Sequence, residues 1–446
     1  MTIPERTVML IGPGGREHEI SRQYEAHASV RQIIMVIGKG SHNTFVEYKR
    51  KKPIIAVQAC DLKDKKAIVD IIRRYRPHHI EFCSDDSLAT GAQDVLRNDY
   101  RVFAPSLAAA EVEHNKHWAR RFMRRNFIPC PESHAFDSQA HAKRYATTIY
   151  TMNPQRRLYI KPHGLTGGRG AELVENLSEA IAAIERMKEF GKAGEIFLIE
   201  ETLEGIEYSL FAISDGKTFR MFRRAVRDYK TVSRERKSRN TGSMGSVCPA
   251  SVPYEEFWGD AKDIFHRAFE GLKNEGRPYV GILYAGVMIV RDSTGSWKMY
   301  VIEFNARWGD TEAQAFLPGV KNYVELVDCA VQGRLDEIEP IEDSLYRICV
   351  VGAAYGYPDS KEYMRVMGEE IFGIEDVLQI PGIRICGAGM EWREGPAHNR
   401  NRFFVRGGRV FNIIAESANR FTACALIETA KASIRTKDNA IFYRQI

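Results

Sequence analysis

Short apolar runs alternate with amphipathic stretches along the first hundred residues. Residues 8–11 and 33–37 are continuous apolar runs, which indicate strands buried on both faces. Residues 62–74 carry apolar side chains three to four positions apart and predict an amphipathic helix, ahead of further strands at 80–83 and 102–103. Strands that alternate with helices predict a parallel sheet with a ligand site at the carboxyl ends of its strands.

The pattern changes after residue 106. The segment begins as helix, with a basic stretch at 116–125, and reaches a strand at 158–161 before a glycine-rich loop. Strands are then expected at 196–200, 207–214, 219–225, 281–290 and 300–304, with a hairpin at Asp215-Gly216 and a helix at 255–274. A second hairpin about Gly407-Gly408, joining 403–406 to 410–414, and a helix at 420–434 complete the expected elements.

Composition and charge are those of a globular protein of about three domains, at roughly 150 residues each for a chain of 446. Lys and Arg number 64 and Asp and Glu 58, and this mild excess suits anionic small molecules without requiring nucleic acid. Eight cysteines form no CxxC pair, which argues against a zinc site or disulfide framework. With no apolar run near the ~20 residues that span a bilayer, we expect a cytoplasmic protein with no membrane partner.

A glycine-rich turn joins the first strand to the first helix. It contains Gly12, Gly14 and Gly15. Such a turn lets backbone N–H groups face an anion, and Arg16 beside it favours a phosphate. Glu17 occupies the third glycine position of the dinucleotide fingerprint, and no acidic residue follows the second strand. These departures argue against an NAD-dependent oxidoreductase and leave a turn without a ligand as the alternative.

A second glycine-rich loop follows a later strand. Lys161 lies near the end of that strand, and the next ten residues include Gly164, Gly167, Gly168 and Gly170. Such a loop can close over a polyphosphate while the lysine counters its charge, although the spacing is not that of a P-loop. A flexible hairpin with no ligand is the alternative.

Acidic residues surround the turn that follows residue 201. Glu200 and Glu201 end one expected strand, and Glu207 begins the next. A turn of this kind can act as a hinge whose backbone pairs with the edge of a base while a carboxylate takes a ribose hydroxyl. Exposed acids at strand ends are the alternative.

Residues 301–310 carry the sharpest signal. Glu303 and Asn305 are two apart on an expected strand, so both side chains leave the same face. A carboxylate and an amide oxygen on one face suit Mg²⁺ when phosphates supply its other ligands. Arg307 continues that face if the strand persists, and it can stabilise charge on a transferring phosphoryl group or a tetrahedral intermediate. The apolar neighbours place this strand in a core and argue against a polar outer face on an edge strand.

Read with Lys116 and Lys161, these motifs resemble those of ATP-grasp ligases, and more closely those of the glycinamide ribonucleotide synthetase (phosphoribosylamine–glycine ligase) family. The matching stretches run in order at 12–18, 161–170, 198–207, 240–245, 281–288, 301–310 and 407–410. The resemblance implies an α/β protein with an N-terminal Rossmann-like parallel sheet at 1–107. Two ATP-grasp lobes would follow, with the glycine flap at 108–195 and the metal site at 196–338, and a small α+β domain at 339–446.

The resemblance also implies an activity. A family member phosphorylates a carboxylate with ATP and Mg²⁺, for which Mn²⁺ is an alternative, and the amine of a phosphorylated ribosylamine then displaces phosphate from the acyl phosphate. With glycine and phosphoribosylamine the products are glycinamide ribonucleotide, ADP and phosphate, in purine biosynthesis. A divergent paralogue that joins a different amino acid or amine is the alternative. The partners are small molecules, and a monomer or homodimer is expected.

Individual roles follow from the same resemblance. ATP would be held by Lys116, Lys161, Gly167, Gly168, Gly170, Glu200, Glu201, Leu203 and Glu207. The substrates would be bound by Gly14, Gly15, Arg16, Glu17, Asp85, Lys230, Asn240, Arg307 and Asp310. Glu303 and Asn305 would bind the metal, and the reaction centre would contain Arg307, Lys161 and Asp228.

Several stretches depart from the family pattern. Asp85 takes the place of a glutamate that normally follows Gly-Pro, and Ser243 stands where the family has a glycine. The loop before Ser243 is basic at 234–239 rather than rich in aspartate, which indicates either a more anionic acceptor or a solvated surface loop. Nucleic-acid binding by the basic stretches is disfavoured because they lack regularly interleaved aromatic residues.

Overall fold

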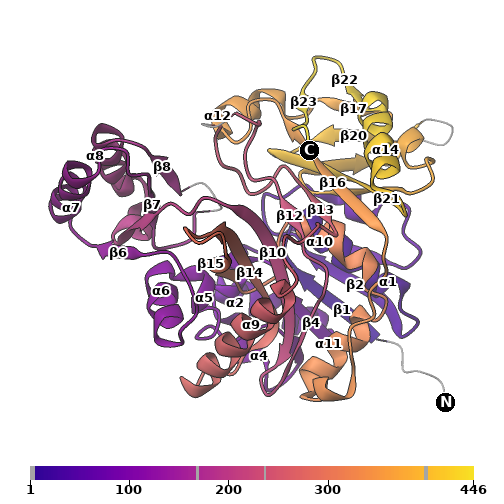
Figure 1. The fold of residues 1–446 in the computed structure, drawn as a ribbon. Helices are drawn as coiled ribbons and strands as arrows, with labels where there is room; N and C mark the ends of the chain where they lie inside the picture. The colour runs from indigo at the N-terminus through magenta and orange to yellow at the C-terminus, as the bar shows by residue number, and fades with distance from the viewer. Residues whose placement is uncertain (1–5, 167–169, 236–237, 396–399) are drawn as a thin grey trace.

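The computed structural model describes residues 6–166, 170–235, 238–395 and 400–446 (Figure 1). Its first part is the expected parallel sheet, in the order β3-β2-β1-β4-β5. The elements are β1 (Arg6–Ile11), α1 (Gly15–Ala26), β2 (Val30–Val36), β3 (Ile54–Val57), α2 (Lys65–Tyr75), β4 (His79–Phe82), α3 (Asp85–Leu88), α4 (Ala92–Leu96) and β5 (Arg101–Phe103). Helix α2 begins three residues later than predicted because the Asp64 carboxylate accepts from the N–H groups of Lys66 and Ala67 and caps the helix there.

A second lobe stands apart on the left of Figure 1. It is a four-stranded antiparallel sheet in the order β6-β9-β7-β8, covered by α7 and α8. Its elements are β6 (Ser133–Phe136), α7 (Gln139–Met152), β7 (Leu158–Pro162), β8 (Glu172–Val174), α8 (Leu177–Arg186) and β9 (Phe197–Glu201). The helices that precede it, α5 (Glu111–His114) and α6 (Lys116–Arg125), pack into the core that also holds residues of the first and third sheets. An apolar cluster of its own, which includes Ile160, Ile184 and Ile199, holds the lobe together.

The third sheet, β11-β10-β14-β15, is antiparallel and lies against α9. Its elements are β10 (Ile206–Asp215), β11 (Phe219–Met221), α9 (Phe257–Asn274), β14 (Val280–Arg291) and β15 (Trp297–Asn305). The hairpin predicted at Asp215-Gly216 is confirmed, since Ser214 pairs with Phe219 across it. The strand predicted to reach residue 225 ends at Met221.

The last part contains two sheets, β12-β13-β16-β21-β18 and β19-β20-β17-β22, with β23 pairing to β16. Its elements are β12 (Arg227–Asp228), β13 (Gly245–Cys248), α10 (Glu312–Phe316), α11 (Tyr323–Gln332), β16 (Tyr346–Ala354), α12 (Ser360–Tyr363), β17 (Glu370–Phe372), α13 (Ile374–Val377), β18 (Ile383–Gly387), β19 (Met390–Arg393), β20 (Arg402–Val405), β21 (Arg409–Ser417), α14 (Arg420–Ser433), β22 (Arg435–Thr436) and β23 (Ile441–Phe442). Strand β13 precedes residue 338 yet pairs with β16, and β12 pairs with β13, so the domain limits given above stay a prediction.

The hairpin predicted about Gly407-Gly408 is wrong. Strand β20 pairs with β17 and β19, whereas β21 pairs with β16 and β18. The glycine pair instead carries the chain from one sheet to the other, since the Gly408 carbonyl accepts from the Ala354 N–H and the Arg406 N–H reaches the Gly389 carbonyl.

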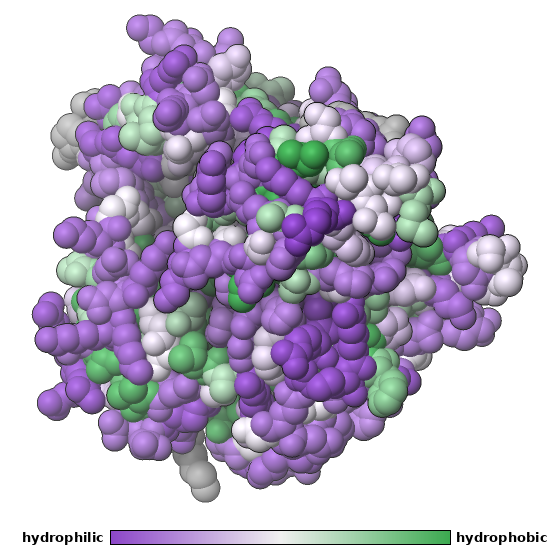
Figure 2. Space-filling view, turned by 90° about the vertical axis from the view of Figure 1, so that its left-hand side faces the viewer, coloured by the Kyte–Doolittle hydropathy of each residue, from purple (hydrophilic) through white to green (hydrophobic). Residues whose placement is uncertain are grey.

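The face shown in Figure 2 is mostly hydrophilic, with apolar residues in small separate groups. Among the helices in the described part of the chain, none has the length and apolar character needed to cross a bilayer.

Candidate active site

Glu303 and Asn305 lie at the end of β15, where the sequence places them. Both pair with β14, opposite Gly286 and Tyr284, and therefore leave the same face of the sheet. The register shifts just before Glu303, and a bulge of this kind re-aims the side chains that follow it. The strand stops at Asn305, so Arg307 does not continue it, but the Arg307 Nη2 still donates to the Asn305 Oδ1 at 3.3 Å.

Three lysines from separate elements converge on Glu303. The Lys230 Nζ lies 3.5 Å from the Glu303 Oε1, and Lys116 of α6 and Lys161 of β7 add their positive charge. Burial alone would raise the pKa of Glu303, but these ammonium groups lower it to about 2. The carboxylate is therefore ionised at neutral pH, and the positive charge around it exceeds its own, which suits a polyphosphate.

Glu200 is buried and holds one of these lysines in place. Its carboxylate accepts from the Lys161 Nζ at 2.6 Å, and from the Arg120 Nε and Nη2 at 2.6 and 3.0 Å. Burial opposes ionisation, yet Arg120 and Lys161 lower the pKa of Glu200 to about 2. The Glu200 side chain thus holds Lys161 in place, while the Glu200 backbone lies near the turn into β10.

Arg120 is a functional residue that the sequence reasoning missed. It also donates to the Ile302 carbonyl at 2.6 Å, so a single guanidinium ties α6 and β9 to the strand of Glu303. The only signal was its place among the basic residues at 116–125, which a solvated helix face explains equally well.

Acid is expected to weaken the protein through Glu200. Its folded pKa of about 2 lies below the ordinary value of 4.5, so the stabilisation is present above about pH 4.5 and is lost as the pH falls toward 2. A depression of this size contributes about 3 kcal/mol. Urea denaturation between pH 7 and pH 2.5 measures the slope, which should be shallower in Glu200→Gln. Equal slopes in the two proteins would contradict the assignment.

The glycine turn before α1 already holds a carboxylate of its own. The Glu17 Oε2 accepts from the Gly14 N–H at 2.8 Å, and its Oε1 accepts from the Arg16 Nε at 2.9 Å. The Arg16 Nη1 donates to the Trp308 carbonyl at 2.9 Å. These internal contacts dock the turn against the loop that follows β15.

Gly15 allows this turn to approach the last part of the chain. A Cβ there would lie 2.0 Å from the Asn412 Nδ2 and 2.8 Å from the Gln314 Nε2. Gly15→Ala is expected to lower the free energy of unfolding by about 1–3 kcal/mol through overpacking. The matched control is Gly259→Ala in α9, where nothing lies within 4 Å and alanine should stabilise the helix by about 0.5–1 kcal/mol. Thermal unfolding of both variants checks the prediction. The prediction fails if Gly15→Ala has the same melting temperature as the wild type.

Two arginines and three carboxylates lie beyond the end of β15. The Arg307 Nη2 pairs with the Glu113 Oε1 at 2.7 Å. Arg307 also lowers the pKa of Asp85 against the effect of burial. The Arg409 Nη2 lies 3.2 Å from the Asp310 Oδ2. Asp85, Arg307 and Asp310 are thus brought together as predicted, whereas Glu113 and Arg409 were not singled out.

Asp228 and Lys230 enter the site from β12 and the segment after it. Lys230 pairs with Glu207 as well as with Glu303. Burial and the nearby Glu312, which sequence reasoning missed, raise the pKa of Asp228. A carboxylate of this kind accepts a proton more readily than an exposed one.

The remaining predicted residues lie around the glycine loop and the hinge. Gly167 and Gly168 fall outside the described residues. A Cβ on Gly170 would lie 2.5 Å from the Pro162 Cγ, so the loop packs closely on the end of β7. The Asn240 Nδ2 donates to the Ala171 carbonyl at 3.3 Å, next to this loop.

The hinge itself is only partly buried. Glu201 accepts from the Glu132 N–H at 2.9 Å, and Leu203 is half-buried in the turn between β9 and β10.

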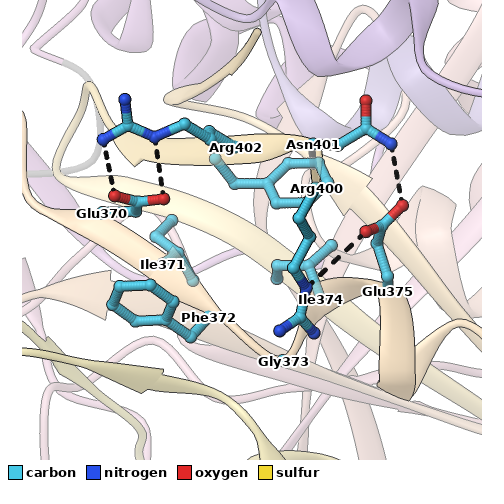
Figure 3. A pocket seen from close by; sticks show the side chains of 10 residues that line it. Glu370, Ile371, Phe372, Gly373, Ile374, Glu375, Arg400, Asn401 and Arg402 are labelled. Carbon is cyan, nitrogen blue, oxygen red and sulfur yellow. Dashed lines mark hydrogen bonds and ion pairs between the residues drawn. The ribbon is translucent and has the colours of Figure 1, made fainter. Parts of the chain in front are cut away.

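A separate cavity of about 460 Å³ lies on β17 and β20 (Figure 3). Its charged side chains bind one another: Glu370 pairs with Arg402, and Glu375 accepts from Asn401. None of the predicted site residues lines this cavity.

Two family models match the chain. The model described as phosphoribosylglycinamide synthetase, N domain, matches residues 6–113, and the one described as phosphoribosylglycinamide synthetase, ATP-grasp (A) domain, matches residues 114–313. A phosphoribosylamine–glycine ligase of Rhodopirellula baltica is 32% identical over 419 residues, which cover 92% of this chain and 90% of that protein. One of Caldanaerobacter subterraneus subsp. tengcongensis is 30% identical, with 98% of each chain covered. A trifunctional purine biosynthetic protein of Homo sapiens is 30% identical over 98% of this chain and 41% of its own length.

Solved structures agree on the fold. A phosphoribosylamine–glycine ligase of Thermotoga maritima superposes with a TM-score of 0.78 at 24% identity, covering 98% of this chain and 99% of that one. The biotin carboxylase domain of a Hydrogenobacter thermophilus 2-oxoglutarate carboxylase gives a TM-score of 0.68 at 15% identity, covering 98% and 91%. The N-terminal parallel sheet and the carboxylate surrounded by three lysines agree with these relatives. The chain belongs to the phosphoribosylamine–glycine ligase family of ATP-grasp enzymes.

Proposed function

We propose that this chain ligates glycine to phosphoribosylamine at the expense of ATP, giving glycinamide ribonucleotide, ADP and phosphate. The observation that carries the proposal is the convergence of Lys116, Lys161 and Lys230 on Glu303. Phosphoryl transfer needs positioning and charge neutralisation more than a covalent nucleophile, and this group of charges supplies both. Family membership then supports the identity of the two substrates.

ATP would lie between the second lobe and the sheet of Glu303. Lys116 and Lys161 would bind its phosphates under the glycine loop, and the turn after Glu201 would pair with the adenine. Glu207 would accept a hydrogen bond from a ribose hydroxyl. Its carboxylate would then interact with both that hydroxyl and Lys230, with which it is paired.

The donor set fits a hard divalent cation. Glu303 offers an ionised carboxylate, and Asn305 offers its amide Oδ1, which accepts from the Arg307 Nη2 at 3.3 Å and has a second acceptor position. In the part of the chain that the structure describes, no three His, Cys, Asp or Glu side chains gather to hold an ion alone, and phosphate oxygens and waters would complete the coordination. Bound there, Mg²⁺ would neutralise charge on the phosphates. Glu303 and Asn305 would position it.

Amide formation would use the residues beyond the end of β15, next to Asn305. The phosphate of the sugar would lie at the turn of Gly14 to Arg16, with Glu17, Asp85 and Asp310 around the ribose. In the second step the amine nitrogen bonds to the acyl carbon, the bond from that carbon to the phosphate oxygen breaks, and phosphate leaves. Arg307 would stabilise the charge on the tetrahedral intermediate, and Asp228 would accept the proton from the amine.

ADP release against a panel of amino acids, with and without ribosylamine 5-phosphate, tests the proposal. Release should require both glycine and the ribosylamine. Equal release with another amino acid in place of glycine would favour the divergent paralogue, and release without any amine would contradict amide formation.

We further propose that the enzyme works in the cytoplasm on small molecules alone, as a monomer or homodimer and without a nucleic-acid or membrane partner. Size-exclusion chromatography with light scattering checks its mass in solution.

A further inference from the structure

Ser243 adopts a backbone conformation that serine rarely takes. Its φ is 135°, a value that favours glycine because a side chain is strained there. The other described non-glycine residues with positive φ lie between 48° and 54°, in the left-handed helical region that L residues tolerate better. The strain is retained in a completely buried residue. A strained residue at the edge of an active site calls for a compensating role.

The Ser243 hydroxyl contacts four polar atoms, of which the Gly245 carbonyl oxygen, at 3.4 Å, is the most distant. It donates to the Asp228 Oδ1 at 2.6 Å and accepts from the Gly245 N–H at 3.1 Å. The Thr311 Oγ1 lies at 2.8 Å. An ionised carboxylate can only accept a hydrogen bond, so the proton of the Ser243 hydroxyl points to Asp228, while the Gly245 N–H takes an acceptor position of the hydroxyl oxygen. The hydroxyl is therefore fully used and fixed in direction.

These contacts join two segments that carry predicted substrate residues. Asp228 and Lys230 come from β12 and the residues after it, while Thr311 follows Asp310 at the start of α10. Thr311 is itself held, since its carbonyl accepts from the Ser246 Oγ at 3.0 Å. Within the described residues, Ser243 makes the only hydrogen bond to the Asp228 carboxylate.

We propose that Ser243 is a positioning residue for amide formation, and that its hydroxyl orients the Asp228 carboxylate toward the attacking amine. The inference rests on the proposed function, in which Asp228 accepts the proton of that amine. Glycine at this position would relieve the backbone strain but leave the carboxylate free to turn away. The orientation that Ser243 imposes on the Asp228 carboxylate thus accounts for a strained serine at this position.

Two variants separate the hydroxyl from the strain. Ser243→Ala removes the hydroxyl and keeps the strain, whereas Ser243→Gly removes both. Initial rates of ADP release are measured with ATP, glycine and phosphoribosylamine varied in turn. Both variants should lose about 10-fold or more in kcat/KM for phosphoribosylamine, as expected for a lost hydrogen bond to a charged group, while KM for ATP changes less than about twofold. Ser243→Gly should melt at a higher temperature than Ser243→Ala.

The outcomes are distinct. Wild-type kinetic constants in Ser243→Gly, with its fold shown by the melting temperature, would overturn the inference and leave the proposed function intact. A rise in KM for ATP as large as the loss in kcat/KM for phosphoribosylamine would also overturn it, because the effect would then be structural. If the wild type itself releases no ADP with glycine and phosphoribosylamine, the proposed function fails, and the inference fails with it.

Discussion

Replacing Glu303 by glutamine should lower ADP release by about 10²–10³-fold, the loss typical of removing one preorganised electrostatic group from a reaction centre. The substitution keeps the shape of the side chain but removes the charge that faces Lys116, Lys161 and Lys230. The three ammonium groups then lose a counter-charge that they share, and the proposed cation would lose a hard ligand. Steady-state ADP release measures the loss.

A binding measurement separates this effect from misfolding. ATP affinity in the wild type should depend on added Mg²⁺, and Glu303→Gln should lose most of that dependence while still binding nucleotide through its lysines. Glu428→Gln is the matched control, because that side chain is 70% exposed and, among the described residues, forms an ion pair with Lys431 alone, on α14. Release of ADP by Glu303→Gln at the wild-type rate would refute the proposal that Glu303 is a metal ligand.

Arg120→Met should lower the free energy of unfolding by about 3–5 kcal/mol, because it leaves a buried carboxylate without its main partner. Glu200 is 1% exposed and takes two hydrogen bonds from this one guanidinium. The Ile302 carbonyl of β15 also loses its hydrogen bond from Arg120. Urea denaturation with a fitted midpoint and slope gives the change.

The double variant Arg120→Met/Glu200→Met provides the control. Replacing both members of a buried ion pair by apolar residues of similar size is often neutral, so the double variant should regain much of the stability. Equal instability in the single and double variants would show that Arg120 acts through packing rather than by pairing with Glu200. A mild loss of less than about 1 kcal/mol in the single variant would show that the pair behaves as an exposed one.

Local sequence patterns predicted the elements well where one sheet face or one turn decides them. The Asp215-Gly216 hairpin and the placement of Glu303 beside Asn305 follow from turn chemistry and strand alternation, which are local. The hairpin at Gly407-Gly408 failed because β20 and β21 each find partners elsewhere, and strand pairing over long separations leaves no trace in the turn.

The candidate site shows the same division. Lys161 and Glu303 carried their own motifs and could be named from sequence. Arg120, Glu113 and Glu312 could not, because each matters only through the charge that the fold brings to it across 80 residues or more. A charged residue on a helix gives no sign of whether it faces water or a buried partner.

The pairing of β13 with β16 has a consequence for anyone who wishes to divide the chain. Cutting near residue 338 would separate Gly245–Cys248 from Tyr346–Ala354, the strands that form the ladder between them. Each fragment would then carry an open sheet edge, and open edges attach to other chains. Split halves of this enzyme would have to be produced together and allowed to complement one another, and a reporter built on such halves would report reunion of the sheet as well as recovery of catalysis.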